Sequence, residues 1–533
     1  MQKTFGIVHQ TFIATICSFT LTAGELVQAQ TDSNPILKIG IVQRFGERPQ
    51  DRLTLKAPSG GKLTLSFPSV DGKTTQTVTS DRVVVEIVSQ PLSQPILEEK
   101  LVLSNHRSFE NAAASAFHWG EKGLQTEISQ PRRWQVWAKR DVYDSMLLRY
   151  LMFYTLRSQG NLTVQLDRRI LPQKAIASLI IGDFRYNRDR LDVSSSEGII
   201  EVSYQRENNP EIKNRSYAGN LKLQTNAHQS YTLVNNVPLE TYVRGVVPHE
   251  IGYNAPYAAV QAQAILARTY VLASAHRFKV DNYELCADTQ CQVYRGLEDT
   301  TELADRAITD TRGLVLTYNN RVIDALYSST TGGITANYND IWDGTPRPYL
   351  ESVLDVANRS ESQRSANVSE DKNLKSFLDR QEGFNEVGWK NIRWRKSGSL
   401  DELQMSLKKF LRFSGDTTTN FNVIRQLAVS KRASSGRVLE MEVTTDTGKI
   451  IVKKDEIIDA FDPPDSTFFR LEPIYKSKVL TGYTFIGGGL GHGVGMSQTG
   501  SYNLARMGWS YDRILNFYYT NVQLQKLRLE HYK

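Results

Sequence analysis

Residues 256–274 read PYAAVQAQAILARTYVLAS, and this stretch predicts one long helix in the interior of the protein. Pro256 stands where the first turn begins, a position at which the missing N–H of proline costs a helix nothing. Small and apolar residues recur at helical spacing along one stripe, at Val260, Ala264, Ala267, Val271 and Ser274. A helix this rich in alanine packs closely against its neighbours, so we expect it to be buried.

Two polar side chains stand on the next stripe of the same helix, which runs through Gln261, Ile265, Arg268 and Leu272. A guanidinium group that is buried without a partner is very costly. Gln261 and Arg268 therefore need partners, which makes both of them candidates for a functional site.

Glu250 stands shortly before this helix, at the end of the segment Val246-Val-Pro-His-Glu. We expect the apolar residues of this segment to form a strand-like stretch. A carboxyl group among apolar neighbours has its pKa raised, and a general acid needs that property. The alternative is a structural glutamate that is favoured by the positive end of the helix dipole.

Two further segments combine glycine with side chains that form hydrogen bonds. The glycine-rich run from Gly487 to Gly495 lets a polymer approach the backbone closely, with His492, Ser497 and Gln498 nearby. It lacks the Lys-Ser/Thr of a P-loop and does not fit the Rossmann fingerprint well, and a tight turn packed under a helix is the alternative.

The second segment, Tyr327-Ser-Ser-Thr-Thr-Gly-Gly, is a hydroxyl-rich strand end that could host a nucleophile beside a histidine. No Gly-x-Ser-x-Gly elbow is present, which argues against that chemistry. The absence of a His-Glu-x-x-His motif also argues against a zinc hydrolase of that type.

The composition of the 533 residues is that of a soluble globular protein, with 40% hydrophobic and 23% charged residues. Lys3, an apolar stretch from Phe12 to Gly24 and the small residues near Ala29 have the layout of a secretory signal, which predicts cleavage near residue 29 and export. An uncut N-terminal anchor is the alternative. No transmembrane span is expected in the mature chain.

The net charge of +7 suits an anionic partner such as a cell-wall polymer, although an evenly spread solubilising charge explains it equally well. No block of Lys and Arg indicates nucleic acid. Of the three cysteines, Cys17 lies in the predicted signal. Cys286 and Cys291 are close enough for a local disulfide. A structural zinc site is the alternative, and it needs two further ligands, for which His276 and Asp288 are nearby.

The chain divides into four predicted parts: the signal at 1–29, an all-β region at 30–130, a small α/β unit at 131–172 and a larger domain at 173–533. The small unit reads strand, helix and strand, with Asp144 or Ser145 as the helix cap. It resembles half of a SPOR domain, a fold that binds peptidoglycan, although any small structural α/β unit gives the same pattern. A polar insertion, expected as a surface loop, lies near 356–385 in the larger domain.

Six segments in the larger domain resemble, in order, the SpoIID/LytB family of stage II sporulation protein D and the amidase enhancer. They are Leu239-Glu-Thr-Tyr-Val-Arg-Gly-Val-Val-Pro-His-Glu, Gln261-Ala-Gln-Ala-Ile-Leu-Ala-Arg-Thr-Tyr, Asp288-Thr-Gln-Cys-Gln-Val-Tyr-Arg-Gly, Thr311-Arg-Gly-Leu-Val-Leu, Tyr327-Ser-Ser-Thr-Thr-Gly-Gly and Gly491-His-Gly-Val-Gly-Met-Ser-Gln-Thr-Gly. The resemblance spans about residues 235–525. It implies an α+β fold, β-rich, with a SpoIID-type catalytic core around the alanine-rich helix.

The resemblance also implies a lytic transglycosylase that cleaves peptidoglycan glycan strands, often strands stripped of stem peptides. It places the catalytic acid/base at Glu250 and an important arginine, which would hold Glu250 or a substrate carbonyl, at Arg268. A helix-to-loop salt bridge that supports the site is the alternative role for Arg268. His249 departs from the small residue that is commoner before the glutamate. The substrate-binding residues that we expect are Gln261, Gln292, Tyr294, Ser329, Thr330, His492 and Gln498.

The same resemblance leaves a second function open, a non-catalytic protein that binds peptidoglycan and activates a cell-wall amidase. A purely structural wall-binding protein is a third. The expected location is outside the cytoplasm, in the periplasm or cell wall, and no cofactor is expected apart from the zinc alternative.

Overall fold

The computed structural model describes residues 34–48, 50–206, 209–358, 366–415 and 420–531. The predicted signal peptide lies outside these ranges. The protein is 26% helix and 38% strand, with several sheets, which confirms the predicted α+β class. Within the described residues, no helix has both the length and the apolar character needed to span a membrane.

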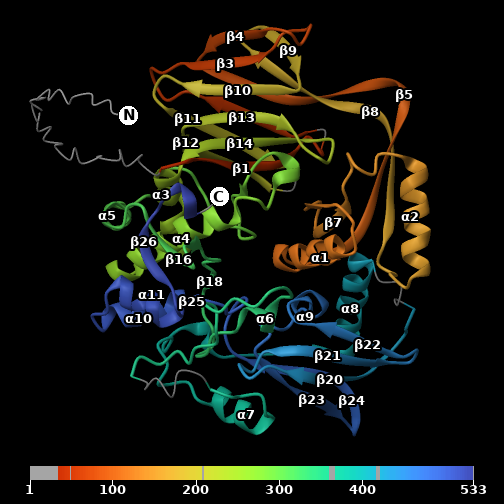
Figure 1. The fold of residues 1–533 in the computed structure, drawn as a ribbon, viewed down its shortest axis with the longest axis vertical. Coiled ribbons are helices and arrows are strands. Elements are labelled where there is room, and N and C mark those ends of the chain that lie inside the picture. The colour runs from red at the N-terminus through yellow and green to blue at the C-terminus, as the bar shows by residue number, and fades with distance from the viewer. Residues whose placement is uncertain (1–33, 49, 207–208, 359–365, 416–419, 532–533) are drawn as a thin grey trace, which may run out of the picture. The chain divides into compact units, whose positions relative to one another are not determined.

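The first sheet has seven strands in the order β15-β1-β14-β13-β10-β3-β4 (Figure 1). Their bounds are Leu285–Cys286, Ile36–Phe45, Tyr231–Pro238, Asn220–Thr225, Arg190–Ser195, Leu63–Pro68 and Thr75–Ser80. Alternate residues of β3 are buried, namely Leu63, Leu65 and Phe67, as the two-residue period of a strand requires when one face is covered. They pack into one core with Val83 and Val85 of the second sheet.

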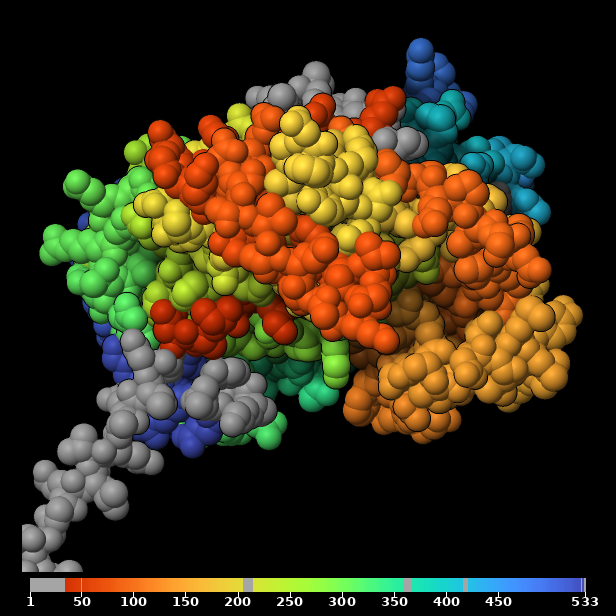
Figure 2. Space-filling model, turned by 90° about the horizontal axis from the view of Figure 1, so that it is seen from above, coloured from red at the N-terminus to blue at the C-terminus, as the bar shows by residue number. Residues whose placement is uncertain are grey.

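The second sheet runs β12-β11-β2-β5-β7-β6, and β8 and β9 extend it beside β5. The bounds are Asn209–Ala218, Ile199–Arg206, Arg52–Lys56, Arg82–His106, Trp134–Ala138, Thr126–Ser129, Gln165–Ile181 and Phe184–Arg188. The long strands β5 and β8 pair from Val84 to Val102, and Figure 1 shows them passing from the sheets toward α1 and α2. On the face seen in Figure 2, the N-terminal part of the chain, coloured red to yellow, covers most of the surface.

The all-β prediction for residues 30–130 is wrong at α1, Phe109–Glu121. Ser108 caps this helix by accepting a hydrogen bond from the N–H of Asn111, and its alanines favour helix. Phe109 and Trp119 bury it against the sheet.

Ser145 caps α2, Met146–Ser158, as the sequence predicts. The flanking strands β7 and β8 both pair with β5 and not with each other. The resemblance of residues 131–172 to a SPOR domain, like the four-part division of the chain, stays a prediction.

The alanine-rich helix is α4, Tyr257–Ser274, and every residue from Ala262 to Leu272 is buried. Around it lie α3 (Leu239–Ile251), α5 (Glu302–Asp310), β16 (Leu314–Tyr318), α10 (Gln498–Arg506) and α11 (Tyr511–Tyr518). Completing this region are β17 (Arg321–Val322) and β26 (Gln523–Lys526), which flank β16.

The strand-like stretch expected before Glu250 is instead helix α3. Leu239, Tyr242, Val243 and Val246 are buried at spacings of three and four residues, which outweighs the strand preference of its valines.

The part of the chain from α6 to β24 has its own apolar core and two three-stranded sheets, β19-β24-β23 and β20-β21-β22. The strands are Trp394–Ser399, Val479–Gly487, Phe469–Lys476, Ile424–Arg432, Val438–Thr445 and Lys449–Lys453. Its helices are α6 (Tyr338–Ile341), α7 (Asp371–Asp379), α8 (Leu400–Ser414) and α9 (Glu456–Ala460). The short parallel pair β18 (Tyr327–Ser328) and β25 (Met496–Ser497) lies at the junction with α4.

The polar insertion expected as a loop at 356–385 contains α7. Leu374 and Leu378 of this helix are buried in a small core with Phe468, which explains why the segment folds.

Candidate active site

A cleft of about 590 Å³ is lined by side chains that are distant in sequence. The end of α3 and the loop at 289–293 contribute Glu250 and Val293. The N-terminal part contributes Phe109 of α1 and Trp134 of β7, and the C-terminal part contributes His492. Further lining residues come from α4 and from the middle of the chain, namely Tyr270, Leu326, Tyr327, Ile341 and Trp342. The cleft therefore exists only once these distant segments have folded together.

Glu250 lies in the last turn of α3, and its carboxylate accepts a hydrogen bond of 2.6 Å from the backbone N–H of Val293. Burial raises the pKa of Glu250, while hydrogen bonds from Val293, Tyr327 and Gln498 lower it in part. The negative end of the helix dipole also disfavours a carboxylate at this end of a helix. The pKa of Glu250 is therefore shifted upward, which is the direction that a general acid needs.

The hydroxyl of Tyr327 is held beside Glu250 by a chain of buried side chains. Tyr242 donates from its hydroxyl to Gln292 Oε1 at 3.2 Å, and Gln292 Nε2 donates to the Tyr327 hydroxyl at 3.0 Å. The Gln292 side chain is fully buried, so it positions Tyr327 and does not itself face the cleft. Burial and the nearby Glu250 charge keep the pKa of Tyr327 well above its ordinary value.

Gln498, at the start of α10, fastens the segment that carries Glu250. Its Nε2 donates to the backbone oxygen of Glu250 at 3.0 Å and to Gln263 Oε1 at 3.3 Å. Gln263 is fully buried in α4, and sequence reasoning missed it because it chose the neighbouring Gln261. Gln261 does not line the cleft, so the structure does not support it as a substrate ligand.

His492 lines the cleft, as the sequence predicts for a residue of the glycine-rich run. Its Nδ1 accepts from the N–H of Val494 at 3.0 Å, and its ring packs against Trp342 at 5.1 Å between centroids. Burial lowers the pKa of His492 to about 4, so the ring is neutral at physiological pH. A neutral ring can offer a hydrogen bond to a sugar but no positive charge.

Arg268 is not a partner of Glu250, which corrects the role expected for it. Its Nε and Nη2 form a bidentate pair with Glu240, at 2.9 and 2.8 Å, and its Nη1 donates to the Leu314 oxygen at 3.0 Å. The side chain is fully buried and does not line the cleft. Arg268 joins α4 to the start of α3 and supports the site from behind.

Three other predicted substrate ligands lie behind the cleft surface. Tyr294 is buried, and its hydroxyl donates to Asn235 Oδ1 at 2.8 Å. Ser329 and Thr330 use their backbone oxygens to accept from Thr499 and Leu490, at 3.1 and 2.9 Å. These residues shape the loops, and their hydroxyl-rich pattern misled the sequence reasoning.

Cys286 and Cys291 are disulfide-bonded in the structure, and Cys291 borders the cleft. The bond closes the loop that leads into Gln292 and Val293. Among the described residues, no group of three or more His, Cys, Asp or Glu side chains is placed so that it could hold a metal ion.

Another part of the cleft lining is rich in charge, and no local pattern in the sequence indicates it. Arg133 of the loop before β7 pairs with Glu456 and with Asp459, both from α9. Asp455 beside them accepts from Asn111 Nδ2 at 2.8 Å. Burial, followed by the charge of Glu456, raises the pKa of Asp455 to about 7.

A buried carboxylate holds together the two loops that were singled out in the sequence. Glu386 accepts hydrogen bonds from the N–H groups of Gly332 and Gly333, both at 2.8 Å, and from the hydroxyls of Thr331 and Ser497, at 2.9 and 2.5 Å. Gly333 has a φ of +90°, where a side chain would also strike the ring of Phe384. Glu386 thereby fixes the segments that carry Tyr327 and Gln498.

Comparisons with known proteins agree with this arrangement. Residues 227–318 match the family model described as Stage II sporulation protein, and residues 336–495 match a domain of unknown function, DUF8618. The chain is 28% identical to the amidase enhancer of Bacillus subtilis over 53% of its own length, and it is 27% identical to stage II sporulation protein D of the same organism over 55%. An uncharacterized protein of Brachyspira hyodysenteriae is 27% identical, also over 55%.

The aligned part covers 40% of the amidase enhancer, 68% of the Brachyspira protein and 76% of the sporulation protein. Glu250 and Arg268 both lie within the 92 residues from 227 to 318 that match the sporulation model. These matches confirm the resemblance predicted from the sequence: residues 227–318, which contain α3 and α4, match the Stage II sporulation protein model, and about half of the chain aligns with the amidase enhancer and with stage II sporulation protein D.

Proposed function

We propose that this protein is an exported lytic transglycosylase that cleaves peptidoglycan glycan strands in the periplasm or cell wall. The observation that carries the proposal is Glu250, a half-buried carboxyl with a raised pKa that lines a cleft large enough for a saccharide. The resemblance to cell-wall related relatives supports the choice of substrate.

In the first step, the protonated Glu250 donates its proton to the glycosidic oxygen that leaves N-acetylmuramic acid. The bond between that oxygen and C1 breaks, and positive charge develops on the muramyl ring. The neutral donors around Glu250 then stabilise the carboxylate that this step creates, since charged acceptors form the stronger hydrogen bonds.

In the second step, the C6 hydroxyl of the same muramyl unit attacks C1, and Glu250 takes the hydroxyl proton. A 1,6-anhydro ring closes, no water is consumed, and Glu250 returns to its protonated form. One carboxyl acts first as acid and then as base, so the second carboxylate of ordinary glycosidases is not required. Tyr327 and Val293 keep Glu250 at one place throughout.

The test is to incubate the purified protein with glycan strands stripped of stem peptides and to identify the products by mass spectrometry. We expect anhydro-ended fragments from the wild type and a loss of about 100-fold or more in Glu250→Gln, the usual contribution of a general acid. Glu302→Gln, the same change on the exposed side of α5, is the matched control and should retain full activity. Equal product from wild type and Glu250→Gln would contradict the proposal.

A second function is favoured by one observation, the similarity of the chain to the amidase enhancer of Bacillus subtilis. In that case the cleft binds glycan without cleaving it and brings a cell-wall amidase to its substrate. Wild-type protein would then yield no anhydro ends but would raise the rate at which an added amidase releases stem peptides from peptidoglycan. The two assays on one preparation therefore separate the two functions.

A further inference from the structure

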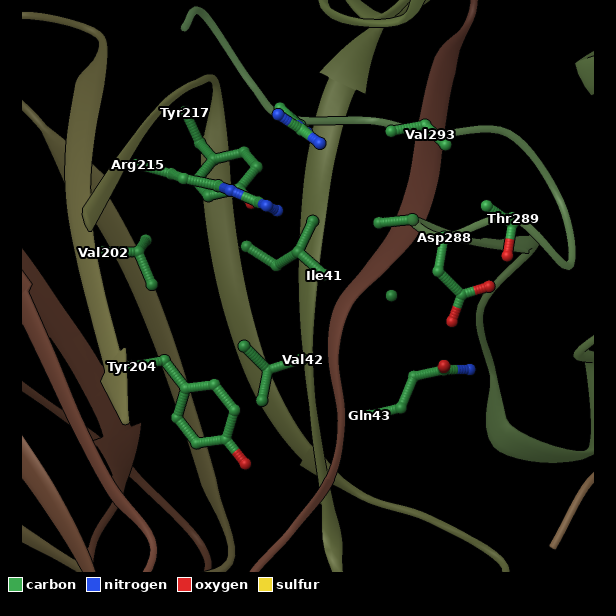
Figure 3. Close-up of a pocket in the computed structure, with 13 residues that line it drawn as sticks. Ile41, Val42, Gln43, Val202, Tyr204, Arg215, Tyr217, Asp288, Thr289 and Val293 are labelled. Carbon is green, nitrogen blue, oxygen red and sulfur yellow. The ribbon is translucent and has the colours of Figure 1, made fainter. Parts of the chain in front are cut away.

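A second hollow of about 470 Å³ lies beside the cleft, bordered by β1, β11, β12 and the loop at 287–295. Figure 3 shows Ile41 and Val42 from β1, Tyr204 from β11, Arg215 from β12 and Asp288 from the loop extending around this space. Most of this hollow comes from residues outside the segment that matches the sporulation family model.

The two hollows share a wall. Thr289 and Val293 line both of them, and the N–H of Val293 is the group that holds the Glu250 carboxylate. The disulfide between Cys286 and Cys291 braces the same loop. The two hollows therefore adjoin at this one loop.

The lining of the second hollow suits a sugar that carries a carboxylate. Arg215 is half-buried, with its nearest ion-pair partner, Glu298, 3.7 Å away, and Arg295 is exposed beside it. Guanidinium groups recognise carboxylates through paired hydrogen bonds. The apolar floor at Ile41 and Val42 and the ring of Tyr204 match the apolar face of a pyranose, as in ligand sites that combine apolar walls with a few polar groups.

We propose that the second hollow is a distal subsite of the same cleft, in which Arg215 and Arg295 bind a carboxylate carried by a muramyl unit away from the cleaved bond. This inference rests on the proposed function, because it takes its ligand from the same glycan strand. The carboxylate has two sources in peptidoglycan, the lactyl group of a stripped muramyl unit and the stem peptide. The subsite binds the negatively charged carboxylate that both sources share.

The test measures affinity in a Glu250→Gln background, where no cleavage disturbs the titration. Three probes of matched length are compared: stripped glycan with free lactyl groups, glycan with stem peptides, and a neutral oligomer of N-acetylglucosamine. We expect the added pair Arg215→Met and Arg295→Met to weaken binding of a carboxylate-bearing probe about tenfold or more, because charged hydrogen bonds are lost. Affinity for the neutral oligomer should stay within about twofold of the background.

A matched control replaces two arginines of the helices α3 and α5, Arg244→Met and Arg306→Met, which line neither hollow. This control should keep the affinity of the background protein for every probe. Loss with the stripped probe identifies the lactyl group, and loss only with the peptide-bearing probe identifies the stem. Unchanged affinity for both charged probes, or an equal loss on the neutral oligomer, would overturn the subsite.

The result also separates the two proposals. If the wild type produces no anhydro ends but affinity still falls with the arginine pair, the proposed function fails and the subsite stands. If the wild type cleaves glycan and the arginine pair leaves every affinity unchanged, the subsite fails and the proposed function stands.

Discussion

The two ends of helix α3 carry glutamates in opposite surroundings. At the first turn, Glu240 receives two hydrogen bonds from Arg268 and one of 3.1 Å from the N–H of Gly313. At the last turn, the partners of Glu250 in the described part of the chain are neutral groups, and burial raises its pKa. One helix therefore supplies both a glutamate paired with an arginine and a glutamate whose pKa is raised.

The helix dipole reinforces this difference, because its positive end stabilises Glu240 and its negative end disfavours an ionised Glu250. A conspicuous arginine in the helix next to a candidate acid therefore need not act on that acid. Full pairing of Glu250 with Arg268 would favour the carboxylate and remove the proton that a general acid must donate.

The largest change in stability is expected when the ion pair between Glu240 and Arg268 at the start of α3 is broken. Arg268→Met leaves Glu240 buried without its cation, so the free energy of unfolding should fall by about 3–5 kcal/mol. The double variant Glu240→Gln with Arg268→Met removes both charges and should recover at least half of this loss. Urea unfolding followed by circular dichroism measures both.

The double variant also tests whether Arg268 has a catalytic role. If Arg268 only supports α3, the refolded double variant cleaves glycan with the pH profile of the wild type. A stable double variant without activity would show that Arg268 acts in the reaction and does not only support α3.

The sequence predicts this region well where the signal is local. The alanine spacing around Ala264 predicts the burial of α4, and the segment ending at Glu250 contains the site acid. The partner of Arg268 could not be predicted, because Glu240 lies 28 residues upstream. It also lies in a helix whose β-branched Val243, Val246 and Val247 favour a strand prediction.

The charged part of the cleft lining could not be predicted in the same way. Asp455 is separated from Glu250 by 205 positions, and only the packing of α9 on α1 brings it to the cleft. The hydroxyl run at 327–331 misled us for a related reason. Hydroxyl groups form hydrogen bonds both to ligands and within loops. The hydroxyl of Thr331 donates to Glu386, which is distant in sequence.

Asp455 extends the comparison to a third carboxyl, which is buried, and it gives the next largest effect. Its folded pKa of about 7 lies above the value of 3.8 for an ordinary aspartate. The folded protein therefore holds a proton that the unfolded chain releases between about pH 4 and 7, and the free energy of unfolding falls as the pH rises through this window. Asp455→Asn stays neutral, so it should be more stable than the wild type at pH 8, by up to about 4 kcal/mol.

Urea unfolding at pH 4 and pH 8 checks this expectation, because the gain should vanish at pH 4. The side-chain oxygen of asparagine can still accept from Asn111, so this contact is retained. Asp401→Asn, on the exposed face of α8, should change stability little at either pH. A gain of the same size at both pH values would mean that the charge of Asp455 is not the cause.

The smallest effect concerns the neutral partners of Glu250. The Tyr327 hydroxyl lowers the pKa of Glu250, so Tyr327→Phe should raise this pKa further. A group that acts in its protonated form then keeps its proton to higher pH, and the alkaline limb of kcat/KM should move upward, with less than about a tenfold loss at the optimum. The profile measured with stripped glycan strands shows the shift.

Tyr318→Phe, a tyrosine of β16 that lines neither the cleft nor the second hollow, is the matched control and should leave the profile in place. A downward shift of the alkaline limb in Tyr327→Phe would mean that Tyr327 favours the proton on Glu250 and does not stabilise its carboxylate. The neutral hydrogen bonds to Glu250 would then not distinguish it from Glu240, and the difference between the two glutamates would depend on burial alone.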